Sequence, residues 1–115
     1  MTTAKFRGNY PFKTTVDYIK NEIHNLGFSV ELVDEVKRGD ENFWVELLVF
    51  EKYYMRVESR ASLTVLITGD ESQSMVDCIA SGASQGVFFR FSWGADKNFL
   101  NGIRKILLAK GYQEI

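Results

Sequence analysis

The single histidine and the single cysteine limit the chemistry that this chain can perform. His24 lies in a segment of apolar periodicity, and Cys78 stands between Asp77 and Ile79. A structural zinc site takes four nitrogen or sulfur ligands, which one His and one Cys do not supply. A nucleophilic Cys needs a helix N-terminus or a cation to lower its pKa, and the sequence places neither beside Cys78. We therefore predict no metal site and no cofactor, a surface position for His24, and a small packed side chain at Cys78.

The small-residue segment from Ser81 to Gly86 is the best local candidate for contact with a ligand. Small residues let backbone N–H groups approach an anion, but the lysine of a P-loop is missing. Ser84 has a glycine two residues before it and two residues after it, as in the nucleophile elbow of hydrolases. That fold needs a longer chain and a downstream histidine, so we predict that the protein is not an enzyme. The segment is then a tight connection between packed elements or a ligand-contacting loop.

Acidic pairs at 34–35, 40–41 and 70–71 raise the question of carboxylate catalysis. A paired-carboxylate mechanism needs two carboxyls across a cleft, one of them with a pKa raised by burial. All three pairs fall at expected turns or strand ends. We therefore predict that water solvates them.

Aromatic residues make up 14% of the chain and are typical of a packed core, an interface or an apolar ligand pocket. If a ligand binds, we expect it to contact Tyr53, Tyr54, Ser81, Gly82, Ser84, Gln85, Phe89 and Trp93.

The net charge of −1 and the lack of a basic run argue against a nucleic-acid partner. No apolar segment approaches the roughly 20 residues that span a bilayer, so we expect no membrane partner. A lone cysteine and no apolar leader segment at the start favour a cytoplasmic location.

Two segments have the apolar stripe of an amphipathic helix. The first begins after Pro11, a residue suited to a first helical turn, or at about residue 14, where Thr14 and Asp17 have the spacing of a capping box. It ends at Gly27. Its stripe consists of Phe12, Val16, Ile19, Ile23 and Leu26. The second begins at Gly94 or Asp96 and ends at Gly111, with a stripe of Phe99, Ile103, Ile106 and Leu107.

Alternating apolar residues predict strands over 4–9, 28–32, 43–50, 61–68 and 74–80. Residues 51–60 suit a strand extension or a turn. Residues 87–93 favour a further strand, with a helical turn at their beginning left open. Short links make the sheet mainly antiparallel.

These elements predict one domain over residues 1–115, an α+β fold in two layers with both helices on one sheet face. The order is β-α-β-β-β-β-(β)-α, which resembles the TATA-binding-protein-like and helix-grip architectures. Strand 43–50 is apolar on both faces. We expect Trp44, Leu48 and Phe50 to lie on the uncovered face and to form an interface.

Several short motifs resemble a family of small uncharacterised bacterial proteins, a domain of unknown function. They are Arg60-Ala61-Ser62-Leu63-Thr64-Val65, Gly69-Asp70, the run from Ala80 to Phe89, and Trp93-Gly94-Ala95-Asp96 before Phe99-Leu100. The resemblance covers residues from about 45 to the end. It implies a bacterial, cytoplasmic protein and implies no activity or catalytic residue.

Two functions remain open from the sequence. The first is a non-catalytic interaction domain that self-associates, as a homodimer through a sheet face or edge. The alternative is a domain that binds a small apolar ligand in a pocket between the C-terminal helix and the sheet.

Overall fold

The computed structural model describes residues 2–27, 29–54, 59–84 and 92–115. In chain order the elements are β1 (Thr2–Gly8), α1 (Phe12–Glu22), the 3-10 helix η1 (Ile23–Leu26), β2 (Glu31–Gly39), β3 (Trp44–Tyr54), β4 (Ser59–Gly69), β5 (Ser74–Ser84), α2 (Ser92–Lys110) and β6 (Gln113–Glu114).

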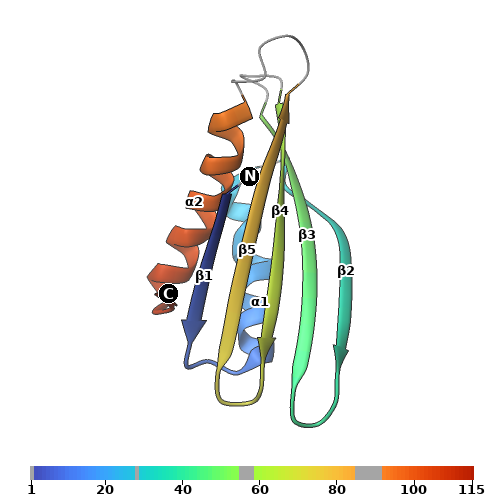
Figure 1. Cartoon of the computed structure of the whole chain (residues 1–115), viewed down its shortest axis with the longest axis vertical. Coiled ribbons are helices and arrows are strands. Elements are labelled where there is room, and N and C mark those ends of the chain that lie inside the picture. Colours follow the sequence, from blue (N-terminus) through green and yellow to red (C-terminus); the bar gives the residue numbers. More distant parts are fainter. Residues whose placement is uncertain (1, 28, 55–58, 85–91) are drawn as a thin grey trace.

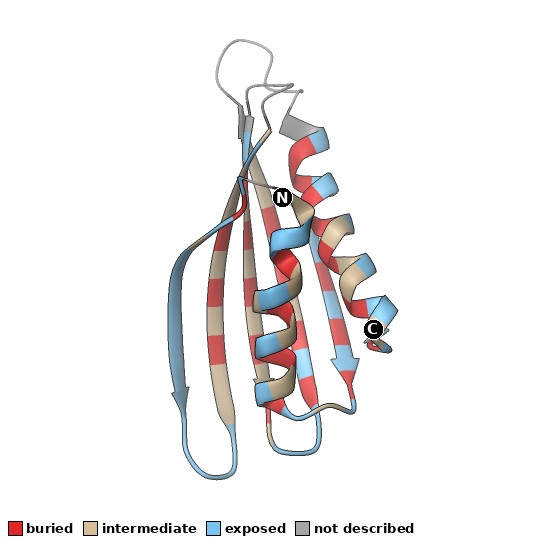
Figure 2. Ribbon diagram, turned by 180° about the vertical axis from the view of Figure 1, so that it is seen from behind, coloured by how far each residue is buried: buried red, intermediate tan, exposed pale blue. Residues whose placement is uncertain are grey.

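The strands form one sheet in the order β2-β3-β4-β5-β1-β6, and every neighbouring pair is antiparallel (Figure 1). Both helices lie on the same face of this sheet (Figure 2). Helix α2 packs over β4, β5 and β1, and α1 packs over β4. The predicted α+β class and two-layer arrangement are confirmed.

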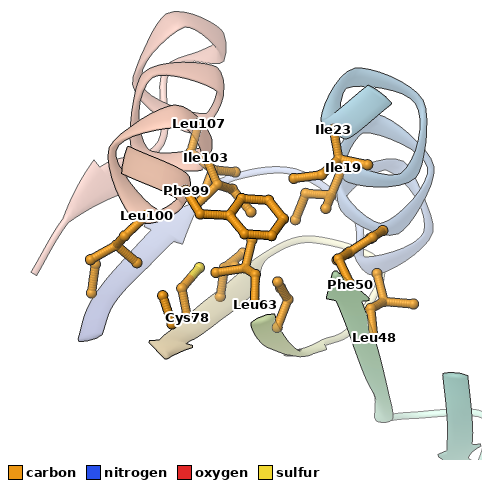
Figure 3. Packing of buried hydrophobic residues seen from close by; sticks show 14 of the residues in the cluster. Ile19, Ile23, Leu48, Phe50, Leu63, Cys78, Phe99, Leu100, Ile103 and Leu107 are labelled. Carbon is orange, nitrogen blue, oxygen red and sulfur yellow. The ribbon is translucent and has the colours of Figure 1, made fainter. Parts of the chain in front are cut away.

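The core lies between the helices and the sheet. Ile19 of α1, Ile23 of η1 and Phe99 of α2 point toward the sheet, where Leu63 and Phe50 lie (Figure 3). All five side chains are at most 1% exposed. Side chains alternate between the two faces of a strand. The buried positions of Leu63 and Phe50 therefore identify the face of β4 and of β3 that the helices cover.

Strand β2 differs from its neighbours because it lies beyond the helix layer and is exposed along most of its length (Figure 2). It begins at Glu31, so the prediction of a strand over 28–32 is wrong in its bounds. Solvent reaches both of its faces, and its residues therefore lack the apolar alternation that would have marked a strand. It pairs with β3 through a bulge at Val33, between Leu32 and Asp34.

The segment after β5 also departs from expectation. Residues 81–84 continue β5 instead of forming a loop. Helix α2 begins at Ser92, so the predicted strand is wrong at Trp93, which lies in the first turn of the helix. Alternation over a few aromatic residues does not separate a strand from a helix start. The rest of that predicted strand, 87–91, lies outside the described residues, as do 55–58.

Candidate functional site

The face of the sheet away from the helices is open and carries an apolar patch; we call it the open sheet face. Its apolar residues are Val36, Val45, Leu47, Val49, Leu66, Met75 and Ile79. Thr64 and Thr68 of β4 lie between these residues on the same face. Val36, Met75 and Ile79 are 39–43% exposed. Monomeric proteins seldom leave a contiguous apolar patch of this kind uncovered, so it is a candidate interaction surface.

The expectation that Trp44, Leu48 and Phe50 lie on the uncovered face is wrong. Leu48 and Phe50 are fully buried beneath the helices. The half-buried ring of Trp44 stacks on Phe12 of α1, with 6.0 Å between the ring centroids. Both faces of β3 carry aliphatic residues, so the sequence alone does not indicate which face the helices cover. Val45, Leu47 and Val49 are the residues of β3 that lie on the open sheet face.

The predicted ligand-contacting residues do not form one site. Tyr53 lies at the end of the open sheet face, with Arg60 over its ring, whereas Tyr54 lies on the helix side and its hydroxyl donates to Asn98 Oδ1 at 3.1 Å. Ser81 pairs with Ser62 at 2.9 Å between their hydroxyl oxygens.

The other predicted ligand contacts lie farther along the chain. Gly82 is paired opposite Ala61 inside the sheet, Ser84 ends β5, and Trp93 lies in the first turn of α2. Gln85 and Phe89 lie outside the described residues.

A pair of carboxyl groups, of which Glu46 is buried and Glu35 exposed, lies between α1 and the β2–β3 hairpin, and sequence reasoning missed it. Glu46 is only 3% exposed and shares a hydrogen bond with Glu35 on the neighbouring strand. Lys20 Nζ lies 2.7 Å from Glu35 Oε2 and 4.0 Å from Glu46 Oε2. Burial first, and Glu35 second, raise the pKa of Glu46 to about 7. The hydrogen bond from Glu46 and that from Lys20 hold the pKa of Glu35 below its usual value.

Sequence spacing gives no signal for this pair, because Glu35 and Glu46 meet through strand pairing and Lys20 arrives from α1. The other acidic pairs behave as solvated turns: Asp40 and Asp70 accept backbone N–H bonds at the two hairpin ends. These turn bonds lower the pKa of Asp70.

A cleft about 290 Å³ in volume lies between η1, α2 and β3; we call it the η1–α2 cleft. Its described lining residues are Leu26, Lys52, Asn98, Phe99, Asn101, Gly102, Lys105 and Ile106. Gly102 lets Leu26 of η1 pack directly on α2, because a Cβ there would meet Leu26 Cδ1 at 2.8 Å. Lys52 reaches into it from β3 and donates to the backbone carbonyl of Leu26.

The single cysteine and the single histidine lie where no catalytic partner contacts them among the described residues. Cys78 is 1% exposed in the core, and burial raises the pKa of its thiol to about 12, which keeps it protonated. His24 is exposed on η1. Within the described ranges, no three His, Cys, Asp or Glu residues are grouped as a metal site would need.

The sequence was also compared with known protein families and with curated proteins. Among the described helices, none is long and apolar enough to cross a membrane. No curated protein matches the sequence. A family model described as a family of unknown function, DUF6054, matches residues 1–110, a longer stretch than the motifs beyond residue 45 had indicated. The chain therefore belongs to the family of unknown function DUF6054.

Proposed function

We propose that this protein is a non-catalytic interaction domain that forms a homodimer by stacking the open sheet faces of two copies. The observation that carries the proposal is the order of residues across that face, which is complementary to itself. Three rows of residues that run across the strands of the open sheet face carry this order.

The rows follow from the strand register. The middle row contains Val36, Leu47, Leu66, Asp77 and Lys5. The row toward the hairpin turns contains Arg38, Val45, Thr68, Met75 and Arg7, and the row on the other side contains Asp34, Val49, Thr64, Ile79 and Thr3.

A two-fold axis along the middle row exchanges the two outer rows between copies. Arg38 then faces the partner's Asp34, and Val45 faces the partner's Val49. Thr68 meets the partner's Thr64, and Met75 meets the partner's Ile79. In the outer rows over β2 to β5, apolar residues thus face apolar residues and hydroxyls face hydroxyls, with one ion pair at each end of the β2 side. On β1, Arg7 faces the partner's Thr3. The contacts are reciprocal, as an isologous interface requires.

The middle row lies on the axis, so Leu66 packs against its own copy there. Asp77 is already neutralised within the chain by Lys5, at 3.2 Å. An axis parallel to the strands would instead place Arg38 opposite the partner's Arg7. Like charges that face each other in an interface oppose association. On the first axis the like charges that meet are Asp77 and Lys5 with their own copies, and these two are paired within each chain. The first axis is therefore favoured.

The face is large enough for a specific contact. Strands about 4.8 Å apart and a two-residue repeat of about 6.8 Å give a patch roughly 20 Å on each side. Stacking two such patches buries on the order of 1,000 Å² in total, near the lower limit for specific interfaces. Pairing through the β2 edge has less support, because that strand carries five charged residues among nine, which disfavour edge-to-edge addition.

The alternative, an apolar ligand held between α2 and the sheet, has less support in the packing. Phe99, Ile103 and Leu107 of α2 are at most 1% exposed, and their side chains fill this layer against Leu63 and Cys78 (Figure 3). The buried, protonated thiol of Cys78 and the exposed His24 support a role without catalysis.

The family resemblance and the free, buried Cys78 support a bacterial cytoplasm as the setting. Fractionation of cells that express the tagged chain would refute this setting if the protein were recovered outside the cytoplasm.

The test exchanges charge between positions 34 and 38 and measures mass by sedimentation velocity. We expect Asp34→Arg and Arg38→Asp each to weaken the dimer by about tenfold or more, since each places like charges across the interface at both ends. A one-to-one mixture of the two variants restores association as a heterodimer, and the double variant restores the homodimer. Lys97→Asp on exposed α2 makes the same change in net charge as Arg38→Asp and leaves association intact.

A wild-type chain that stays monomeric at several hundred micromolar would overturn self-association. A dimer that the single variants leave unaffected, or that the mixture fails to restore, would refute this axis and this face. Circular dichroism of each variant shows that the exchanges, which lie on exposed residues, leave the fold unchanged.

A further inference from the structure

The η1–α2 cleft concentrates hydrogen-bond donors from two elements that are far apart in sequence. Asn98, Asn101 and Lys105 follow one another at spacings of three and four residues, so they share one side of α2. Lys52 lies across from them on β3. The described lining holds two ammonium groups and no carboxylate, although the chain as a whole carries a net charge of −1.

The hydrogen bonds of the two asparagines fix which side-chain atoms remain available. Arg104 donates to Asn101 Oδ1, and a guanidinium has no acceptor, so the oxygen of Asn101 must face Arg104. Tyr54 donates to Asn98 Oδ1 at 3.1 Å, and burial raises the pKa of this phenol to about 12, which keeps it a donor. Both amide NH₂ groups are therefore left without a partner among the described residues.

Lys52 is the least solvated of these donors. Its ammonium donates to the carbonyl of Leu26 and lies 4.6 Å from the centre of the Tyr54 ring. Within the described part of the chain, neither Lys52 nor Lys105 has a carboxylate in ion-pair range. Burial lowers the pKa of Lys52, as expected for an ammonium that has lost water without gaining an anion.

We propose that the η1–α2 cleft binds a small oxyanion, of the carboxylate or phosphate type, between Lys52 and Lys105. The amides of Asn98 and Asn101 orient the oxygens through donated hydrogen bonds. Leu26, Phe99 and Ile106 form an apolar floor that takes a short aliphatic part of the same molecule. Charge-assisted hydrogen bonds are the stronger class, so the two lysines supply most of the selectivity for an anion. This site is separate from the open sheet face and does not depend on dimerisation.

The test titrates the full-length protein with sodium phosphate, with sodium butyrate and with butylammonium chloride, and follows backbone and side-chain amide signals by NMR. We expect phosphate or butyrate to shift the side-chain NH₂ signals of Asn98 and Asn101 and the backbone signal of Gly102. Butylammonium, which has the same aliphatic part and the opposite charge, leaves them in place. The stronger of the two anions identifies the oxyanion class.

Lys52→Met and Lys105→Met remove each charge and retain most of the aliphatic stem. Each is expected to weaken the anion's affinity by about tenfold, since one charge-assisted bond is lost. Lys97→Met, on the same helix but outside the cleft, is the matched control and retains wild-type affinity. Lys105 is exposed, so its variant carries the test even if Lys52→Met does not fold.

Three results would overturn the site: no shift with either anion, shifts that follow ionic strength equally with sodium chloride, or equal losses in Lys105→Met and Lys97→Met.

Discussion

The two faces of strand β4 both contain aliphatic and small residues, yet their environments differ. Leu63, Val65 and Ile67 face the helices and are fully buried. Thr64 and Leu66 alternate with them on the open sheet face and are half-buried. The difference between the two sets lies in what covers them: α1 and α2 lie on one side, and the described chain places nothing on the other.

The treatment of polar groups separates the two faces further. On the covered face, the hydroxyl of Thr15 lies within hydrogen-bond distance of Ser74 Oγ at 2.6 Å and of the Tyr112 hydroxyl at 2.5 Å. The buried carboxyl of Glu46 interacts with the side chains of Glu35 and Lys20. A buried polar group without a partner is expensive, whereas the threonines of the open face can use water. A sealed face therefore constrains sequence more tightly than an open one.

The largest contrast between the faces is expected for leucine truncation. Leu63→Ala should lower the free energy of unfolding by about 3 kcal/mol, because it leaves a cavity in a fully buried site. Leu66→Ala, three residues along the same strand, should lower it by about 1 kcal/mol or less, because solvent already reaches that side chain and no closed cavity forms. Urea denaturation, at a protein concentration where sedimentation shows a monomer, measures both.

For association, the order of the effects of these two substitutions is reversed. Leu66→Ala is expected to weaken the proposed dimer, while Leu63→Ala is expected to leave the dissociation constant of the remaining folded protein unchanged. Equal losses of stability at the two positions would show that the faces are covered alike and would remove the contrast.

The helices and hairpins were predictable because their signals are local. The stripe from Phe12 to Leu26 and the stripe around Ile103 need only a 3.6-residue period. The turns at Gly39 and Gly69 carry the polar residues that reverse a chain. The choice of covered face in β3 was not predictable, because two aliphatic sets give no local preference. Strand β2 was misplaced since solvent on both sides removed its pattern.

The candidate sites were less accessible to sequence reasoning than the fold. The Glu35–Glu46 pair depends on the register of β2 against β3, in which Glu35 lies opposite Leu48 and Lys37 opposite Glu46. The η1–α2 cleft joins Lys52 to Asn98, residues brought together only by tertiary packing. Of the segment that the sequence favoured, residues 81–84 belong to β5 and pair with β4, and residues 85–86 lie outside the described part of the chain.

The pH dependence of stability gives a second contrast between the faces. In the folded chain the pKa of Glu46 lies at about 7, above its ordinary value of 4.5. The folded state therefore holds a proton that the unfolded state has lost, and stability falls as the pH rises from about 4.5 to about 7. Glu46→Gln should abolish this decline and be about 2 kcal/mol more stable than the wild type at pH 8, with little difference at pH 5.

Glu35 acts in the opposite direction. Its lowered pKa stabilises the fold above about 4.5, and that contribution is lost as the pH falls further. Because the pair titrates as a unit, the decisive readout is the slope between pH 5 and 8, taken from denaturation curves at several pH values. Glu51→Gln, on the same strand but 44% exposed, is the control. A slope that Glu46→Gln leaves intact would mean that another group titrates there.

The smallest contrast concerns two threonines. Thr15→Val should destabilise the chain by about 1 kcal/mol, since Ser74 and Tyr112 lose the hydroxyl that links them in a site closed to water. Thr64→Val should change stability by at most about 0.5 kcal/mol, because its hydroxyl faces the open side and valine suits a strand. Thermal denaturation at one fixed concentration resolves the two. If Thr64→Val proved as damaging as Thr15→Val, the open sheet face would need its hydroxyls as much as the core does, and water would not be the medium that satisfies them.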